Sequence, residues 1–453
     1  MKSQNSISSS SAWYLIGVLW FTYVVSFLDR MILTLLIEPI KADFGLTDFQ
    51  SSLLVGFSFV LFYVSFGLPV AYFADQTNRK RLIMIAVTIW GTMTALCGTA
   101  KNFTSLLLFR FGVGAGESAL HPSALSMISD AFEPERRTLP MSIFLSAATA
   151  GVALSYILGS LLYGFAQKFG VYQLPIIGDV KPWQTTLLLV ATPAFLSVAL
   201  LAFVKEPSRV NRGDCDAKEQ IRPSEIFKHL KDYPLVYVGS ILGPAIANMA
   251  MYSFMTWIPS MFARSYGWPP EKSGVAIGLT MVIGGIVGTI LVPIVKKYAE
   301  KTGVPDSAYA VSIITLIMSA VSVSSLPFID NAWIVIGAFA FTSIFGVFLN
   351  VLPQVSLQHI APDRLRAQIT AIWLIASNLI GFGLGPSGTA LLSDALASDG
   401  SQLRTALSIF SAASFAVAAV TMYLCRPYVL ARLPQEKPGT STTQEIDKVS
   451  AVG

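Results

Sequence analysis

Residues 13–37 read WYLIGVLWFTYVVSFLDRMILTLLI, an apolar stretch whose only charged residues are Asp29 and Arg30. An α-helix needs about 20 apolar residues to cross the hydrocarbon core of a bilayer. This stretch is too long for the core of a cleavable signal peptide, and no small-residue cleavage site follows it. We therefore expect it to form a retained first membrane helix.

Similar apolar stretches recur along the chain, and with the first they predict about twelve membrane spans. The others lie near residues 50–73, 82–100, 103–129, 138–165, 184–204, 234–262, 273–295, 307–327, 332–357, 367–393 and 404–425. Of the 453 residues, 53% are hydrophobic and 13% are charged, about half the charged fraction of a typical soluble protein. This composition indicates an all-α integral membrane protein and excludes a water-soluble enzyme.

The longest polar stretch between spans divides them into two groups of six. We expect a polar N-terminal tail at 1–12, a six-helix bundle at 13–204, a central loop at 205–233, a second bundle at 234–425 and a disordered tail at 426–453. Within the loop, residues 223–230 have the pattern of a short amphipathic helix, with Ser224 as its cap and Ile226, Phe227 and Leu230 on one face.

The basic residues indicate how the chain is oriented. The chain has 31 Lys and Arg against 26 Asp and Glu. If both termini are cytoplasmic, the cytoplasmic segments hold about three times as many Lys and Arg as the opposite side, as the positive-inside rule requires. The basic excess thus predicts orientation in a plasma (bacterial inner) membrane, and no nucleic-acid partner is expected.

The two halves echo each other in sequence. The segment FEPERR at 132–137 follows the fourth span, and the segment IAPDRL at 360–365 follows the tenth. Two six-helix halves related by an axis through the molecule predict such a repeat. With these halves, the loop DQTNRKR at 75–81 resembles the signature of the major facilitator superfamily. The resemblance implies a charge network that holds the cytoplasmic ends of the halves together when the carrier is open to the outside. We expect its members to be Asp75, Arg79, Lys80 and Arg136.

A narrower resemblance comes from charged residues inside the spans. The sequences FLDR at 27–30 and RFGVGAGES at 110–118, with Pro122 shortly after, are similar to those of the Spinster group of transporters, bacterial branch. The resemblance covers essentially the whole chain and implies movement of lysolipids or sphingolipid-like amphiphiles. Organic-anion carriers, including sugar-acid permeases, also share an Arg-bearing first helix.

Four ionisable residues carry the chemistry that we expect: Asp29, Arg30, Arg110 and Glu117. A charge at bilayer depth costs about 2.5–3.5 kcal/mol, so the four must pair or line a wet cavity. Arg110 and Glu117 are two helical turns apart on one face, about 10 Å along the axis, with Gly114 between them. Adjacent residues point about 100° apart, so one of Asp29 and Arg30 should meet the fourth span and the other should reach the central cavity.

We interpret these residues as a proton-coupling site. Burial favours the neutral form of a carboxylate and a nearby Arg favours the charged form, so Asp29 or Glu117 can change protonation as the cavity opens to either side. His121, one turn beyond Glu117, is a candidate extension of this relay, or a packing residue. The alternative for the whole set is a static salt-bridge cluster.

The second half offers aromatic, Met and amide side chains instead of charges. These candidates for substrate binding, together with Arg30 and His121, are Asn248, Tyr252, Met255, Trp257, Asn350, Gln354, Trp373 and Asn378. Such a mixture suits the apolar part of an amphiphile whose anionic head meets an Arg. For each of these residues alone, packing between helices or against lipid is an equal alternative.

The sequence therefore predicts a monomeric secondary transporter that works by alternating access, with protons, an amphiphilic anion and the bilayer as its partners. An organic-anion or sugar-acid proton symporter is the alternative, and a membrane receptor on the same scaffold is a remote one. We expect no enzyme, metal or cofactor, because three scattered Cys and three His supply no cluster. The glycines at 112–116 lie in an apolar helix rather than after a strand, which excludes dinucleotide binding. The stretch GFGLGP at 381–386 is a candidate bending point or a close-packing surface.

Overall fold

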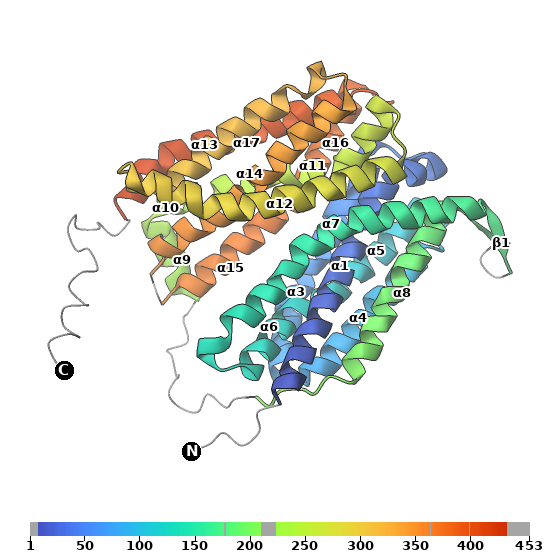
Figure 1. Cartoon of the computed structure of the whole chain (residues 1–453), viewed down its shortest axis with the longest axis horizontal. Helices are drawn as coiled ribbons and strands as arrows, with labels where there is room; N and C mark the ends of the chain where they lie inside the picture. Colours follow the sequence, from blue (N-terminus) through green and yellow to red (C-terminus); the bar gives the residue numbers. More distant parts are fainter. Residues whose placement is uncertain (1–7, 176–177, 210–222, 363, 398, 433–453) are drawn as a thin grey trace.

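The computed structural model describes residues 8–175, 178–209, 223–362, 364–397 and 399–432. The side chains of a few residues inside these ranges, Asp75 among them, lie outside the description. The chain forms two bundles of long helices that lie side by side (Figure 1).

The first bundle comprises the helices of the N-terminal half. They are α1 (Ser9–Phe44), α2 (Asp48–Ser52), η1 (Leu53–Phe57), α3 (Ser58–Gln76), α4 (Arg79–Cys97), α5 (Phe103–Glu117), α6 (Leu120–Ala131), η2 (Pro134–Arg136), α7 (Thr138–Phe169) and α8 (Pro182–Ala202). Helices α2, η1 and α3 follow one another directly and form one bent span, in which η1 is a π-helical turn. A two-stranded hairpin of β1 (Tyr172–Leu174) and β2 (Gly178–Val180) joins α7 to α8.

The second bundle follows the short helix α9 (Pro223–Asp232). Its helices are α10 (Pro234–Tyr237), η3 (Val238–Leu242), α11 (Gly243–Tyr266), α12 (Pro270–Lys301), α13 (Ser307–Ser324), η4 (Leu326–Phe328), α14 (Ala332–Ile360), α15 (Arg366–Ala376), η5 (Ser377–Leu384), α16 (Gly385–Leu396) and α17 (Leu403–Leu430). The glycine-rich stretch predicted as a bending point falls largely in η5, which is π-helical. Two π-helical turns, η3 and η5, thus interrupt spans of this half.

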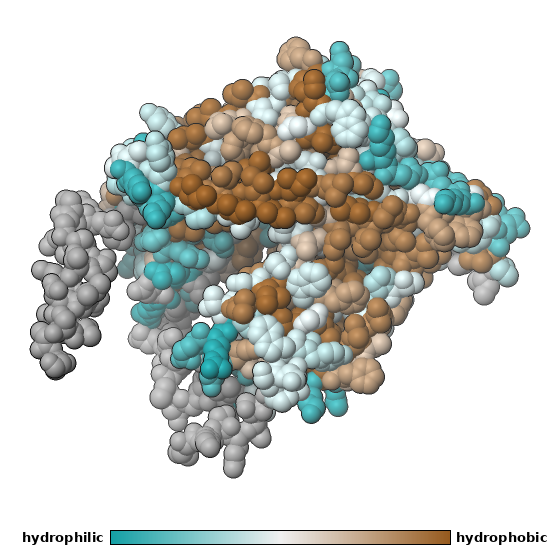
Figure 2. All heavy atoms as spheres, in the orientation of Figure 1, coloured by the Kyte–Doolittle hydropathy of each residue, from teal (hydrophilic) through white to brown (hydrophobic). Residues whose placement is uncertain are grey.

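Eleven helices among the described residues are long and apolar enough to cross a membrane. The predicted fourth span is the twelfth, and it is broken: α5 ends at Glu117 and α6 begins at Leu120. The prediction of twelve spans in two six-helix bundles is confirmed. Figure 2 shows a hydrophobic surface over α12 and the adjoining part of α7, with hydrophilic residues gathered toward the ends, as lipid contact requires.

The two halves touch at one end of the molecule and diverge toward the other (Figure 1). We call the end that holds Ser9 and Leu430 the terminal end, and the opposite end, which holds Phe44 and Tyr266, the distal end. Helices α7 and α12 form the most intimate contact between halves, and glycines make it possible. A Cβ added at Gly278 would lie 2.6 Å from Ile157 Cγ1 and 2.8 Å from the Ala153 carbonyl oxygen. Small residues at such a crossing let two helix backbones approach closely.

The predicted amphipathic helix exists as α9, but its details differ from the prediction. Ile226 and Leu230 pack on a cluster at the terminal end of the second half, whereas Phe227 is 72% exposed and does not share that face. Ser224 lies inside the helix, which begins one residue earlier, so it is not the cap. This packing explains why Phe227 is exposed, because contact of Ile226 and Leu230 with the cluster sets the orientation of the helix. Most of the loop before it, and the tail after residue 432, lie outside the described residues.

The α7–α12 contact generates a prediction about stability. Gly278→Ala should lower the thermal unfolding temperature of the purified protein, because the new methyl group meets the Ala153 carbonyl and the Ile157 side chain. Gly337→Ala is the matched control: a Cβ there meets nothing within 4 Å, and removal of a helical glycine alone stabilises. Equal unfolding temperatures for the two variants would contradict the close packing.

Candidate functional site

The centre of the first bundle holds an ion pair between α1 and α5. Arg30 Nη2 donates to Glu117 Oε2 over 2.8 Å, and Ser26 Oγ donates to the same oxygen over 2.7 Å. Ser26 and Arg30 are one helical turn apart, so both side chains reach Glu117 from the same face of α1. The Glu117 side chain is 0% exposed and that of Arg30 is 12% exposed. Arg30 is therefore the member of the Asp29–Arg30 pair that meets the fourth span.

Three aromatic rings surround the Arg30 guanidinium. Its carbon Cζ lies 4.3 Å from the centroid of Phe59, 4.8 Å from that of Phe27 and 5.2 Å from that of Tyr63. A cation within about 6 Å of a ring face is attracted by its quadrupole, and more strongly when water is excluded. Sequence reasoning missed Phe59 and Tyr63, although their four-residue spacing along the second span places them on one face. We call Phe27, Phe59 and Tyr63 the aromatic box.

Asp29 points into the first bundle rather than into a cavity. It is 0% exposed, and its Oδ2 accepts a hydrogen bond of 3.3 Å from Thr94 Oγ1 in α4. Its Oδ1 has no partner among the described residues. The expectation that the second member of the pair reaches the central cavity was therefore wrong, because the 100° step around α1 turns Asp29 toward α4.

Arg110 binds backbone rather than a carboxylate. Its Nη1 donates to the carbonyl oxygen of Asp29, and its Nε donates to that of Leu54, each over 3.3 Å. Leu54 lies in the π-helical turn η1, so Arg110 ties the bend of the second span to α1. Gly114 makes this approach possible: a Cβ there would lie 2.7 Å from the Phe59 carbonyl oxygen. As expected, Gly114 leaves no side chain between Arg110 and Glu117, and the backbone of α3 packs closely against α5 at this point.

His121 does not continue the face of Glu117. The break at residues 118–119 separates the two, and the His121 ring packs against Tyr23 and Phe144, with centroid distances of 5.8 and 6.0 Å. Of the two interpretations of His121, the structure favours the packing residue.

The candidates in the second half fall into different places. Tyr252 and Met255 on α11 pack against the hydrophobic cluster of the first bundle, which includes Phe59 and Phe382. The rings of Phe59 and Phe382 are 6.2 Å apart, and those of Tyr252 and Phe382 are 4.9 Å apart. A chain of rings therefore leads from the aromatic box to the second half. Phe382, in η5, is a further residue that the sequence reasoning missed.

Most of the remaining candidates pack or hydrogen-bond within the second half. Trp257 is 0% exposed and donates to the Pro386 carbonyl oxygen, and Trp373 is buried in the cluster on which α9 packs. The amides of Asn350 and Asn378 donate to carbonyl oxygens one turn earlier in their own helices. Asn248 is 5% exposed beside Gly381, and Gln354 is half-buried in α14. Of these six residues, Asn248 borders the chain of rings, since Asn248 and Tyr252 both pack beside Gly381.

The charged motif after the second span acts within one half in this structure. Arg79 is 1% exposed and binds Asp130 in α6 at 2.5 Å and Glu206, just after α8, at 3.4 Å. Lys80 Nζ donates to the Ala202 carbonyl oxygen, and Arg136 is exposed. The Asp75 side chain lies outside the description. The family resemblance implies a charge network between the two halves. In this structure Arg79 instead binds Asp130 and Glu206.

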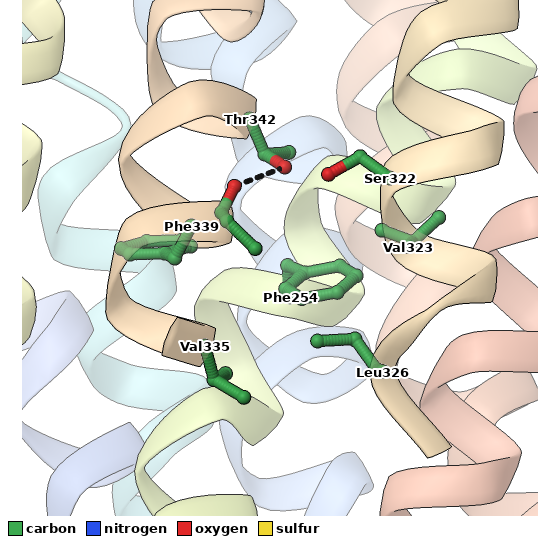
Figure 3. A pocket seen from close by; sticks show the side chains of 8 residues that line it. Phe254, Ser322, Val323, Leu326, Val335, Phe339 and Thr342 are labelled. Atoms are coloured by element: carbon green, nitrogen blue, oxygen red, sulfur yellow. Dashed lines mark hydrogen bonds between the residues drawn. The ribbon is translucent and has the colours of Figure 1, made fainter. Parts of the chain in front are cut away.

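A small cavity beside α1 and η1 is lined by Leu33, Ile37, Ile40, Ser51, Leu54 and Val55, and another lies apart from the four charges. The second sits within the second half between α11, α13 and α14, lined by Phe254, Val323, Leu326, Val335 and Phe339 (Figure 3). It has room for about one water molecule. No group of metal-ligating side chains occurs among the described residues. The candidate site is thus the ion pair, its aromatic box and the rings that face it.

Comparisons with known proteins agree with this fold. The family model of the Major Facilitator Superfamily matches residues 19–386. An MFS-type efflux pump of Mycolicibacterium smegmatis is 27% identical over 417 residues, 91% of this chain and 92% of that protein. The sphingosine-1-phosphate transporter SPNS2 of Danio rerio is 25% identical over 403 residues, 84% of this chain and 76% of that protein.

A solved structure shares the fold. The crystal structure of a bacterial homolog of the human lysosomal transporter Spinster, inward-facing and unoccupied, superposes with a TM-score of 0.75 and 22% identity. The match covers 96% of this chain and all of that one. The chain therefore belongs to the major facilitator superfamily of transporters, and its relatives include Spinster proteins.

Proposed function

We propose that the protein is a proton-coupled carrier that moves an amphiphilic anion of the lysolipid or sphingolipid type. The observation that carries this proposal is the Arg30–Glu117 pair, in which one buried cation is shared between a titratable carboxylate and an aromatic box. The sphingosine-1-phosphate transporter among the relatives supports the substrate class, since its named substrate is an anionic amphiphile.

Competition for Arg30 would couple substrate to protons. An anionic head group that takes Arg30 displaces the Glu117 carboxylate, which then lies buried without a cation. A buried carboxylate in this condition takes up a proton, because the charged form is poorly solvated. Loss of the proton restores the ion pair and expels the anion. Asp29, beside Thr94 and with one oxygen unpaired, is the second candidate for protonation.

The rings beyond Arg30 suit an apolar tail better than a hydroxyl-rich substrate. Tyr252, Met255 and Phe382 continue the apolar surface from the aromatic box. A sugar acid would need polar partners for its hydroxyl groups, whereas the side chains that continue from the aromatic box are mostly apolar. A sugar-acid carrier is therefore the second candidate, favoured by the anion-binding Arg30 and by a probable L-galactonate transporter of Escherichia coli among the relatives, 24% identical over 270 residues.

The membrane orientation follows from charge. The excess of Lys and Arg on the terminal end supports a cytoplasmic location for both termini in a bacterial inner membrane. The closed distal end then faces outward, and the halves diverge toward the cytoplasm (Figure 1). Two halves that rock about a midplane site would expose Arg30 to each side in turn.

Neutralisation of Glu117 tests the coupling. In the wild type, binding of an anionic lysophospholipid should strengthen as pH falls, since protonation of Glu117 frees Arg30. Glu117→Gln should bind the same probe without this pH dependence and should fail to use an imposed pH gradient in liposomes, as should Asp29→Asn if it shares the proton. Lys297→Gln, at an exposed position in α12, is the control. Intact pH-driven transport in both carboxylate variants would refute proton coupling here.

Substitution of the cation and its box tests the substrate class. Arg30→Lys keeps the charge but loses the planar group that stacks on the rings, and should weaken binding of lysophosphatidate by about tenfold. Phe382→Ala should weaken binding of long-chain lysolipids more than that of short-chain ones, because it removes apolar contact only. Competition binding with gluconate is the counter-test. Tight gluconate binding with no effect of lysolipids would favour the sugar-acid carrier instead.

A further inference from the structure

A second cluster of charges lies at the distal end, away from the Arg30 site. It joins Glu38 and Lys41 of α1 and Asp48 of α2, in the first half, to Arg264 of α11 and Asp394 of α16, in the second. Asp48 is 0% exposed although it carries a carboxylate. Within the spans of a membrane protein, buried charges are paired and mark functional elements.

Arg264 forms the cationic link from the second half to the first. Its Nη1 and Nη2 donate to the two carboxylate oxygens of Asp48 over 2.8 and 2.7 Å, a bidentate fork. Its Nε and Nη2 also donate to Glu38 Oε1 over 3.0 and 2.7 Å. Such planar, charge-assisted pairs are the strong hydrogen bonds of proteins. Both acids belong to the opposite half, so these bonds exist only while the distal end is closed.

Asp394, in the second half, accepts hydrogen bonds from the first half. Its carboxylate accepts hydrogen bonds from the backbone amides of Asp48 and Phe49, over 3.2 and 2.9 Å, and so caps the start of α2 from the other half. Ser393 Oγ donates to Asp48 Oδ2 over 2.9 Å. The second half thus holds Asp48 by its side chain and by its backbone.

Lys41, unlike Arg264, lies in the same half as Asp48. Its Nζ donates to Asp48 Oδ1 over 2.5 Å, the oxygen that also accepts from Arg264 Nη2. When the halves separate, Asp48 loses Arg264 and Ser393 but keeps Lys41. Arg264 keeps only groups of its own half, the Gly400 carbonyl oxygen at 3.1 Å and the Trp257 ring at 6.0 Å.

We infer that the two cations that bind Asp48 have opposite effects: Arg264 holds the distal end closed, and Lys41 makes opening possible. Arg264 stabilises only the closed arrangement, because its acids lie across the boundary. Lys41 stabilises Asp48 in both arrangements, and it contributes more in the open one, where it is the sole cation left to a carboxylate that would otherwise be unpaired. The two neighbouring cations therefore shift the closed–open equilibrium in opposite directions.

A cysteine reporter at the boundary tests this inference without knowledge of the substrate. Ser52 is buried, and its hydroxyl lies 3.3 Å from that of Ser387 in the other half, so Ser52→Cys becomes accessible only when the distal end opens. The background replaces Cys97, Cys215 and Cys425. The measured quantity is the rate of maleimide labelling of the purified full-length protein, which does not depend on membrane orientation.

Arg264→Gln should raise the labelling rate by about tenfold, and Lys41→Met should lower it by about as much. Arg264→Lys, which keeps the charge but not the fork, should fall between wild type and Arg264→Gln. Lys181→Met and Arg404→Gln are matched controls, since each removes a distal ion pair that lies within one half, with Asp43 or Asp330, and each should leave the rate unchanged.

The opposite signs of the two effects distinguish this inference from simple stabilisation of the closed end. A cluster that only stabilises the closed end predicts faster labelling in both Arg264→Gln and Lys41→Met. That outcome, or no change in either variant, would overturn the inference. Size-exclusion profiles identify any variant that has lost its fold, and the rate decrease expected for Lys41→Met cannot arise from unfolding, which exposes the cysteine.

Discussion

A charge inside a bilayer must have a partner, and this constraint organises the molecule. The first bundle is arranged so that Arg30 meets Glu117 and three rings, while Arg110 meets two backbone carbonyls. To bring these groups together, the second span bends through a π-helical turn and the fourth span breaks just after Glu117. Irregular backbone at this depth is tolerated because protein groups, rather than lipid, surround it.

Much of this could be predicted from the sequence, because the strongest physical signals in it are local. Apolar length gives the spans, and the cost of intramembrane charge singles out Asp29, Arg30, Arg110 and Glu117. The seven-residue spacing of Arg110 and Glu117, with Gly114 between them, also predicts which face of α5 is buried. The pairing within the set was left open, and the structure resolves it: the Ser26–Arg30 face of α1 meets Glu117, whereas Asp29 turns toward α4.

The rest depends on tertiary contacts that have no periodic signature. Trp257 and Trp373 carry side chains typical of binding sites, but helix packing buries both, and sequence does not distinguish the two roles. The break after Glu117 has neither a proline nor a cap at the point where it occurs, so the fourth span reads as one helix. The distal cluster was missed because Glu38, Asp48 and Arg264 lie near span ends, where charges are common and only their meeting across the halves is informative.

The aromatic box has a consequence for how such carriers can diverge. Arg30 contacts a carboxylate with its charged edge and rings with its faces, so the two sets of contacts are made by different residues. In the proposed carrier, a change of ring would alter which ligands fit and would leave the Arg30–Glu117 ion pair intact. Under the proposed function, descendants of one ancestral sequence could therefore acquire new cargo through single aromatic substitutions while they inherit the same ion pair.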